Sequence, residues 1–473
     1  MRRVTGLAAA VALAGLWAAL AAGSAQAASF AYVTNGGGTT VSQFRIRGGG
    51  QLSPLAPAGV TAGNSPFWVA LTLDGREAYV SNMLDNTVTH FDVASSGPLA
   101  ARPPATATGT TPLGLDVSPN ARNVYVANTG SNTVSQFDVR SGGVLRAKSP
   151  ATVPAGVQPA GVAISPDGRS AYVGNAGDST ISQYDVGAGG ALSPKSPASV
   201  AADNTPADMA VAPDGRTLYV SNRLGNTVSQ YHVGKDGRLS PLSPATVAAE
   251  TGPEGISITP DGRNVYVAAA RNNLVLQFTV RRRGTLTPKS PASVPVSGFL
   301  PFPADTAVSP DGKTVYATNR LGGTVSQFAV GAGGRLTARS PELVSVGSLP
   351  VGMATTPPQL PAVQQLKVTP RRFVVGRRAS LRLTLTGVIK ARLRVTIRPV
   401  GRCTGPRLGP GASACARYGL LRTARVGRNR LKLPGRIGGQ VLPAGRYRAT
   451  VVARGATGKR SDPETAAFRI TGG

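Results

Sequence analysis

Hydrophobic and polar positions follow one pattern that returns along most of the chain. A clear copy covers residues 165–186, SPDGRSAYVGNAGDSTISQYDV, where an Asp-Gly turn leads into a short apolar run and then an alternating run. Alternation with period two indicates half-buried strands, and Asp-Gly is typical of a tight turn. An apolar run at residues 160–165 precedes this copy, and a proline-interrupted run at 191–200 follows it, as expected of an edge strand. One copy therefore predicts four short antiparallel strands.

A tyrosine marks each copy and gives the period. Successive tyrosines are 47, 46, 47, 47, 47 and 50 residues apart, at Tyr32, Tyr79, Tyr125, Tyr172, Tyr219, Tyr266 and Tyr316. A fixed period of this length predicts one supersecondary unit repeated, each unit too small to bury its own faces. Four antiparallel strands per unit describe the blade of a β-propeller.

The two ends of the repeat array complement each other. Residues 29–60 hold three strands without an innermost one, whereas residues 349–355 hold an isolated innermost strand. A blade built from both segments closes the ring and leaves no unpaired inner edge. We therefore predict an all-β, seven-bladed β-propeller over residues 28–356, closed by the C-terminal inner strand and the three N-terminal strands.

The chain departs from this period at both ends. Arg2 and Arg3, an apolar run at residues 7–22 and the small residues before position 28 have the layout of a secretory signal peptide at 1–27; a retained membrane anchor is the alternative. A Pro-rich linker is expected at 357–365. In residues 366–473 the period stops, and clean alternation, for example at 380–386 and 391–398, predicts about seven strands of an immunoglobulin-like β-sandwich.

Positive charge concentrates in this C-terminal part. The formal net charge of the chain is +30, and residues 361–473 hold 25 Lys and Arg against two acids. Such a surface attracts anionic cell-wall polymers or a membrane surface, while a plain solvated basic face is the alternative. Nucleic acid is not expected, because interleaved aromatic residues for base stacking are lacking. Cys403 and Cys415 favour one local disulfide in an exported protein. We expect a secreted or cell-envelope-associated monomer.

The repeat also resembles a known family. SPDGR…YVxN…NTVSQFxV followed by GGxLxP is similar to the YVTN-repeat and lactonase-type seven-bladed propellers, over roughly residues 29–356. The C-terminal segment LPAGRYRATVVARGATGKRSDP more loosely resembles β-sandwich modules of secreted bacterial proteins. The propeller resemblance implies either a lactone hydrolase, like the propeller-type 6-phosphogluconolactonases, or a non-catalytic surface propeller.

The catalytic members that this resemblance implies carry His and Arg directly after the proline that opens the innermost strand. The corresponding pairs here are Phe67-Trp68, Leu113-Gly114, Ala160-Gly161, Ala207-Asp208, Glu254-Gly255, Ala304-Asp305 and Val351-Gly352. None of them contains His or Arg. The two histidines, His90 and His232, fall in third strands, where they replace Gln and Asp and are interpreted as substituted strand residues.

Departures from the repeat indicate where a site would lie. The start of the innermost strand and the loop after the second strand share one face of a propeller, and acids and arginines depart from the repeat together there. The candidate ligand-binding residues at this channel mouth are Trp68, Asp208, Arg223, Glu254, Arg271, Asp305 and Arg320. They would bind a small polar ligand. Ordinary surface ion pairs are the alternative.

Cofactor and metal signals are weak. The sequence lacks His/Cys spacing for zinc and a 12-residue calcium loop, so no metal or cofactor is expected; a calcium ion in the channel, near Asp116, Asp208 and Asp305, is the alternative. Catalytic residues are not assigned. The sequence favours a non-catalytic binding or scaffold protein at the bacterial cell envelope, with a lactonase of divergent site as the alternative.

Overall fold

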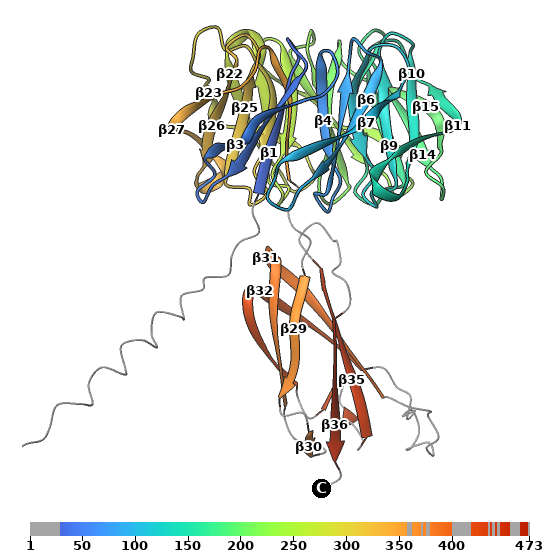
Figure 1. The fold of residues 1–473 in the computed structure, drawn as a ribbon, viewed down its shortest axis with the longest axis vertical. Helices are drawn as coiled ribbons and strands as arrows, with labels where there is room; N and C mark the ends of the chain where they lie inside the picture. The colour runs from blue at the N-terminus through green and yellow to red at the C-terminus, as the bar shows by residue number, and fades with distance from the viewer. Residues whose placement is uncertain are drawn as a thin grey trace, which may run out of the picture.

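The computed structural model describes residues 29–356 with their side chains and, further along the chain, eight strands by their backbone. Seven four-stranded antiparallel sheets form the first part, and Figure 1 shows them from the side. Each sheet follows the order expected of a blade, from an innermost to an outermost strand. The predicted all-β seven-bladed propeller is confirmed.

The blades are numbered here from the one that contains the N-terminal strands. Blade 1 is β28 (Pro350–Thr355), β1 (Ser29–Asn35), β2 (Thr40–Ile46) and β3 (Leu52–Thr61); blade 2 is β4 (Pro66–Leu71), β5 (Glu77–Asn82), β6 (Thr87–Val93) and β7 (Leu99–Ala107); blade 3 is β8 (Pro112–Val117), β9 (Asn123–Asn128), β10 (Thr133–Val139) and β11 (Leu145–Pro154); blade 4 is β12 (Pro159–Ile164), β13 (Ser170–Asn175), β14 (Thr180–Val186) and β15 (Leu192–Ala201). Blade 5 is β16 (Pro206–Val211), β17 (Thr217–Asn222), β18 (Thr227–Val233) and β19 (Leu239–Ala248); blade 6 is β20 (Pro253–Ile258), β21 (Asn264–Ala269), β22 (Leu274–Val280) and β23 (Leu286–Pro295); blade 7 is β24 (Pro303–Val308), β25 (Thr314–Asn319), β26 (Thr324–Val330) and β27 (Leu336–Ser345).

The ring closes as the two ends of the array predict. Strand β28 pairs antiparallel with β1, with Ala354 opposite Tyr32. Beyond the paired residues, the backbone N–H of Phe30 donates to Thr356 Oγ1 at 3.0 Å, and the N–H of Thr356 donates to the Phe30 carbonyl at 2.8 Å. Segments more than 300 residues apart in the sequence thus complete one sheet.

The repeated tyrosine joins neighbouring blades. The Tyr172 hydroxyl of blade 4 donates to the carbonyl of Gly237, in a turn of blade 5, at 2.6 Å. Gly237 has φ +78, and a Cβ there would lie 1.9 Å from Ser170 Oγ, so the turn needs glycine both for its backbone and for this close approach. The other six tyrosines donate in the same way, to Gly97, Gly143, Gly190, Gly284, Gly334 and Gly50.

The repeated glutamine of the third strand makes a second cross-blade link. Gln183 is fully buried, and its Nε2 donates to the Pro197 carbonyl of its own blade at 2.9 Å. Its Oε1 accepts from the N–H of Leu239, on the outermost strand of the next blade, at 3.0 Å. Gln43, Gln136, Gln230, Gln277 and Gln327 repeat both bonds. The repeat motif therefore encodes contacts between blades as well as strands within them.

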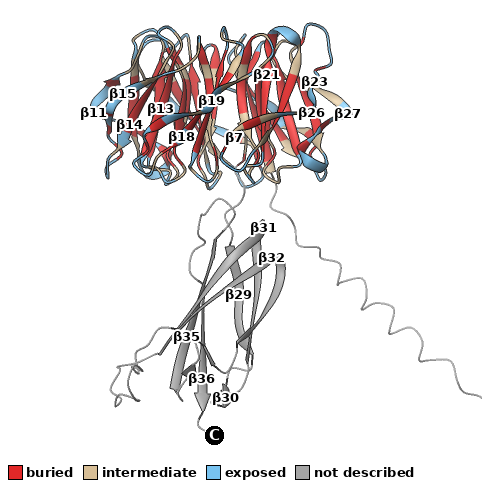
Figure 2. Ribbon diagram, turned by 180° about the vertical axis from the view of Figure 1, so that it is seen from behind, coloured by how far each residue is buried: buried red, intermediate tan, exposed pale blue. Residues whose placement is uncertain are grey.

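The hydrophobic core lies between adjacent sheets. One cluster joins Tyr172 and Ile181 of blade 4 to Met209, Leu218 and Val220 of blade 5. Buried residues lie on the inner strands, whereas the outermost strands and the loops are exposed (Figure 2). Strand β7 illustrates the outer edge, since it is exposed along most of its length. Each blade thus buries its faces only against its neighbours, as the long period requires.

Strands continue after the propeller. One sheet has the order β29 (Ala362–Thr369), β31 (Ala379–Pro399), β35 (Gly445–Arg454), β36 (Glu464–Thr471) and β30 (Arg372–Val374), with β32 (Tyr418–Leu433) also paired to β31; β33 (Arg436–Ile437) and β34 (Gln440–Val441) form a hairpin. The two alternating runs expected at 380–386 and 391–398 belong to the single strand β31. Its pairing with β32 shifts register between Leu385 and Lys390, which accounts for the break in alternation. The immunoglobulin-like sandwich stays a prediction.

Several expectations fall outside the described residues. These are the signal peptide at 1–27, the first part of the linker at 357–361, and the disulfide between Cys403 and Cys415. The last part of the predicted linker, from Ala362, belongs to β29. Within the part of the chain that the structure describes, no helix has the length and apolarity needed to cross a membrane.

Candidate functional site at the channel mouth

Seven innermost strands form the wall of the central channel. Strands β4, β8, β12, β16, β20, β24 and β28 contact one another in this order around a closed ring. Each begins at a proline, and the loop that follows the second strand of the blade returns to this end: the N–H of Arg223 donates to the carbonyl of Thr205, directly before Pro206, at 2.8 Å. We call this end of the channel the channel mouth, as the sequence predicts it.

An ion pair crosses the boundary between blades 5 and 6 at the channel mouth. Arg223 Nη1 lies 3.5 Å from Glu254 Oε1, with 43% of the Arg223 side chain and 13% of the Glu254 side chain exposed. Ser221 anchors the glutamate backbone, because its hydroxyl donates to the Glu254 carbonyl. The pair therefore joins the second-strand loop of one blade to the innermost strand of the next, and its carboxylate is held at the rim.

Asp208 lies deeper, within the channel wall. It is buried, and its carboxylate accepts hydrogen bonds from the N–H of Met209 and from the N–H of Ile256 in the next blade, the latter at 2.9 Å. Burial raises the pKa of Asp208 to about 7, even though the two backbone donors act in the opposite direction. The negative charges of Glu254 and Asp116 raise it further. The acids at this end of the channel thus act on one another.

Asp305 repeats this arrangement in blade 7. Its Oδ1 accepts from the N–H of Thr306 at 2.7 Å, and its Oδ2 accepts from the N–H of Met353 in β28 at 2.8 Å. Burial raises the pKa of Asp305 well above its usual range, and the charge of Asp208 adds to the effect. Asp208 and Asp305 thus each bridge a blade boundary, between blades 5 and 6 and between blades 7 and 1.

Asp116 of blade 3 makes the same kind of bridge from a different position. Its oxygens accept from the N–H of Val117 at 2.7 Å and from the N–H of Ile164 in blade 4 at 2.9 Å. The three aspartates named as alternative calcium ligands therefore each bind backbone N–H groups across a blade boundary. A calcium ion in the channel stays a prediction.

The remaining candidate side chains differ in their surroundings. Arg271, in the loop after β21, is exposed and lies along Gly252, whose Cα would place a Cβ 3.1 Å from Arg271 Cγ. Arg320 is half-buried, and its Nε lacks a hydrogen-bond partner among the described residues. Trp68 is half-buried against the core between blades 2 and 3. Of the seven candidates, Arg223 and Glu254 form an ion pair. The charge of Glu254 raises the pKa of Asp208, and the charge of Asp208 raises the pKa of Asp305.

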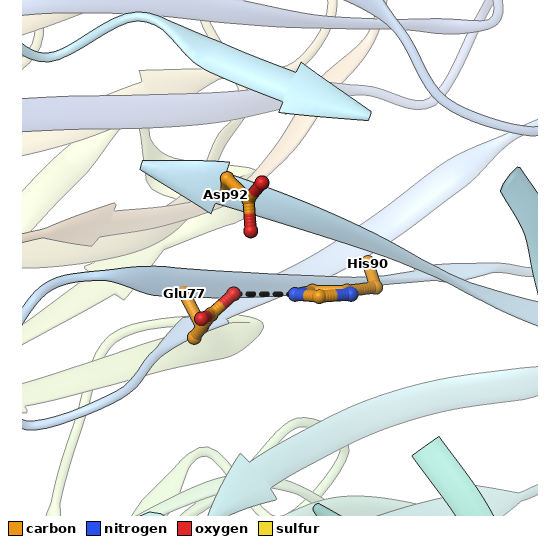
Figure 3. Close-up of side chains that lie close together, drawn as sticks. All are labelled: Glu77, His90 and Asp92. Carbon is orange, nitrogen blue, oxygen red and sulfur yellow. Dashed lines mark hydrogen bonds and ion pairs between the residues drawn. The ribbon is translucent and has the colours of Figure 1, made fainter. Parts of the chain in front are cut away.

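The two histidines lie elsewhere. His232 is exposed on β18, and His90 is buried on β6, where its Nε2 is 2.5 Å from Glu77 Oε2 (Figure 3). From the sequence alone, His90 is interpreted only as a substituted strand residue. The signal for a larger group was present: Glu77, two residues before the blade tyrosine, stands where other copies have Asn, Ser, Thr or Phe.

The channel mouth combines a rim carboxylate, guanidinium groups and buried acids. A rim carboxylate next to a guanidinium can accept a proton from water while the guanidinium donates hydrogen bonds to a developing negative charge. The same arrangement can bind a polar ligand without reaction.

A family model described as "Lactonase, 7-bladed beta-propeller" matches residues 24–157 and 192–302, which is more than half of the chain. No curated protein matches the chain at a significant level. The match covers blades 1–6 except for most of blade 4 and strand β28 of blade 1. It includes Asp208, Arg223, Glu254 and Arg271, whereas Asp305 and Arg320 lie beyond it.

Solved structures share the propeller at low sequence identity. A putative 6-phosphogluconolactonase from Bacteroides fragilis is 22% identical with a TM-score of 0.61, covering 70% of this chain and 99% of that chain. A periplasmic gluconolactonase from Pseudomonas aeruginosa is 21% identical with a TM-score of 0.59, covering 69% and 99%. A putative 6-phosphogluconolactonase from Bacteroides uniformis is 21% identical with a TM-score of 0.60, covering 70% and 100%. At this identity the likeness shows the fold alone.

Proposed function

The chain belongs to the seven-bladed β-propeller lactonase family, and from this membership we propose that it hydrolyses the ester bond of a sugar lactone at the channel mouth. The observation that carries the proposal is the ion pair of Arg223 with Glu254 at the rim, the one acid–arginine ion pair among the candidate residues, all of which the structure describes. The similar structures of a putative 6-phosphogluconolactonase and a periplasmic gluconolactonase suggest the substrate class: a glucono-lactone, with or without a phosphate.

Glu254 acts as the general base in this proposal. Its carboxylate takes a proton from a water molecule as the water oxygen attacks the lactone carbonyl carbon. The carbonyl oxygen becomes an oxyanion, and the Arg223 guanidinium donates hydrogen bonds to it. When the tetrahedral intermediate collapses, the bond between the carbonyl carbon and the ring oxygen breaks. The ring oxygen then receives the proton from Glu254, which yields a hydroxy acid.

The other charged residues have supporting roles. Arg271, exposed at the same end of the channel, supplies positive charge for a substrate phosphate or hydroxyl group. Buried Asp208 accepts from the N–H of Ile256 and so fixes the position of β20, the strand that carries Glu254, whereas buried Asp305 accepts from the N–H of Met353 and ties blade 7 to β28. They are positioning residues, because their oxygens already accept protein hydrogen bonds.

Steady-state hydrolysis of glucono-δ-lactone and its 6-phosphate, followed by acid release, tests the proposal. We expect turnover above the spontaneous rate, and a loss of kcat of about 10²–10⁴-fold in Glu254→Gln, the range for removal of a general base. Glu342→Gln, on the outermost strand of blade 7, is the matched control and should keep full activity. Wild-type protein that hydrolyses neither lactone, or Glu254→Gln protein with wild-type kcat, would contradict the proposal.

A binding protein without turnover is the second candidate. It is favoured by one observation: among the described residues, both histidines lie away from the channel mouth, and a histidine base is what the family resemblance implies. The two functions give different results with the same probes. A binding protein gives saturable calorimetric binding of the sugar acid, weakened by Arg223→Gln, with no acid release from the lactone.

Export and attachment to the envelope complete the proposal. The support is the charged, apolar and small-residue order of residues 1–27 and the 25 Lys and Arg against two acids in residues 361–473. Co-sedimentation of the full chain with isolated bacterial cell walls tests the second point. Electrostatic attachment is lost on raising the salt concentration, so sedimentation that persists at high salt would contradict it.

A further inference from the structure

Three metal-binding side chains meet on one face of blade 2, away from the channel mouth. Glu77 on β5 stands directly opposite Asp92 on β6, and His90 is paired with Tyr79, two residues further along. Because alternate residues of a strand share a face, Glu77, His90 and Asp92 all project from the same side of the sheet. One potential ligand atom from each lies within 4.8 Å of the others. Figure 3 shows a carboxylate oxygen of Asp92 directed toward the contact of Glu77 with His90.

Other blades hold a cation at this position. In blade 3, the Lys148 ammonium donates to Asp138 Oδ1 and, at 2.7 Å, to the carbonyl of Gly189 in the next blade. Lys195 does the same in blade 4, with Asp185 and the Asp236 carbonyl. Both ammonium-bearing side chains are buried, at 6% and 2% exposure. In blade 6, Lys289 donates to the equivalents of Asp92 and Glu77, namely Thr279 Oγ1 and Asn264 Oδ1. In blades 3, 4 and 6, therefore, an ammonium group lies at the same position, in contact with a carbonyl of the next blade.

Blade 2 lacks this lysine. Its equivalent is Arg102, which lies opposite His90 and turns outward to Asp92, with its Nη2 2.5 Å from Asp92 Oδ2 and 49% of the side chain exposed. The buried space that the lysine ammonium fills in blades 3 and 4 is occupied in blade 2 by the contact between Glu77 and His90. Arg102 Nη2 and Nε both contact Asp92 Oδ2 and compensate the charge of Asp92 from the outer side. A cation on the inner side would lie between the Glu77 and Asp92 carboxylates, which stand directly opposite each other and repel one another.

The histidine itself departs from the repeat at this point. The other six blades carry the buried glutamine that links two strands, whereas His90 has no amide oxygen to accept from the next blade. Its ring instead stacks on Tyr79, with 5.1 Å between ring centroids, and directs Nε2 at Glu77. Blade 2 therefore carries an imidazole in place of the repeated glutamine, Arg102 in place of the lysine of blades 3, 4 and 6, and a second acid at Glu77.

We propose that Glu77, His90 and Asp92 bind a divalent transition-metal ion of the zinc class. One imidazole nitrogen and two carboxylate oxygens are typical Zn²⁺ ligands, with metal–ligand bonds of about 2.0–2.2 Å. Binding requires side-chain rotations that bring the three ligand atoms, now within 4.8 Å of one another, to this distance from a common centre. The site stays open on one side, because 20% of Glu77 and 35% of Asp92 are exposed, so water completes the coordination. The ion links β5 to β6 and takes the place of the buried ammonium group.

Zn²⁺ titration of the full chain after chelator treatment, in competition with a chromophoric chelator, tests this site. The informative variant is His90→Gln, because glutamine is the residue that the other six blades carry and the variant is therefore expected to fold. His232→Gln removes the other histidine, which is exposed on blade 5, and is the matched control. We expect one ion per chain in wild type and in His232→Gln. His90→Gln should lose at least about 100-fold in affinity, since even changes to groups that only hydrogen-bond a metal ligand cost about 10–100-fold.

Arg102→Lys and Co²⁺ provide two further readouts. Arg102→Lys restores the buried ammonium and should weaken Zn²⁺ binding by competition. Visible absorption of bound Co²⁺ reports nitrogen and oxygen ligands, whereas near-ultraviolet thiolate absorption would assign the ion to Cys403 and Cys415. Thiolate absorption, equal Zn²⁺ affinity of wild type and His90→Gln, or absence of binding to wild type would each overturn the proposal. Lactone turnover is a separate measurement, so its absence leaves this test unaffected.

Discussion

Asp305 accepts a hydrogen bond from the N–H of Met353 at 2.8 Å and thereby ties the innermost strand of blade 7 to the strand that closes the ring. Asp208 makes the equivalent link between blades 5 and 6. Burial of both carboxyl groups favours their protonated form and raises their pKa values. The stability of the propeller should therefore depend on pH through the same residues that join its blades.

The first prediction concerns that dependence. Burial raises the pKa of Asp208 and of Asp305 above the unfolded value near 4, so between the unfolded and folded values the folded chain holds protons that the unfolded chain has released. The contribution of each group to the free energy of unfolding is therefore greatest below pH 4 and falls as pH rises, for Asp208 through about pH 7.

Asp208→Asn removes the titrating group and should make this fall shallower, by up to about 1.4 kcal/mol per pH unit. Urea unfolding at a series of pH values from 4 to 8 measures the slope. Asp85→Asn, in an exposed loop of blade 2, is the control and should retain the wild-type slope. A wild-type slope in Asp208→Asn would show that this carboxyl does not titrate differently on folding.

A second prediction concerns the buried glutamine. Gln183→Met keeps the shape of the side chain but leaves the Pro197 carbonyl and the Leu239 N–H without their partner. Each unsatisfied buried group costs about 1–3 kcal/mol, so we expect a loss of about 2–4 kcal/mol in the free energy of unfolding. Gln51→Met is the control: Gln51 is exposed, so water replaces the bond that its Nε2 donates to the Ser340 carbonyl at 2.6 Å, and stability should stay within about 0.5 kcal/mol of wild type. Equal effects of both substitutions would contradict the linking role.

The sequence predicts the blades because their signals are local. Asp167 accepts from the Arg169 N–H two residues away, and the strand alternation lies within six or seven residues. It also predicts the ring closure, since two incomplete sheets at opposite ends need one partner each.

The contacts at the channel mouth are harder to predict from the sequence, because they join different blades: Arg223 pairs with Glu254 of the next blade, and Asp208 accepts from the N–H of Ile256. Which side chain crosses a blade boundary depends on the angle between sheets, which no local pattern records. His90 is different: its substitution for the repeated glutamine is visible in the sequence, but only the structure shows that it lies beside Glu77 and Asp92.

The third prediction tests the effect of His90 on stability without metal. In the presence of a chelator, His90→Gln restores an amide that can donate to the carbonyl of Pro104 and accept from the N–H of Leu145, the equivalents of the partners used by Gln43. We expect an increase of about 0.5–1.5 kcal/mol in the free energy of unfolding. The reverse change, Gln136→His, should destabilise blade 3, because it removes the bonds to Pro150 and Leu192. Metal-free His90→Gln that is less stable than wild type would mean that the histidine contributes more than the glutamine it replaces.

The last prediction separates the catalytic role of the rim pair from a structural one. Arg223 and Glu254 are 3.5 Å apart and the arginine is nearly half exposed, so solvent screens their attraction, and their coupling should contribute only about 0–1 kcal/mol to stability. A double-mutant cycle of Arg223→Gln, Glu254→Gln and the double variant in urea unfolding measures this coupling. The same variants assayed for lactone hydrolysis should lose far more in kcat than the stability change accounts for.

The two losses in kcat should also fail to add. If Glu254 activates water and Arg223 stabilises the resulting oxyanion, both act in the same transition state, so the double variant should be scarcely slower than Glu254→Gln alone. The contrary result is a coupling free energy above about 2 kcal/mol in unfolding, with losses of kcat no larger than the loss of folded protein explains. That result would identify the pair as a structural link between blades 5 and 6. A small coupling with a large, non-additive loss of kcat is the outcome that only a reacting pair produces, because surface ion pairs of this exposure do not otherwise affect the rate of a chemical step.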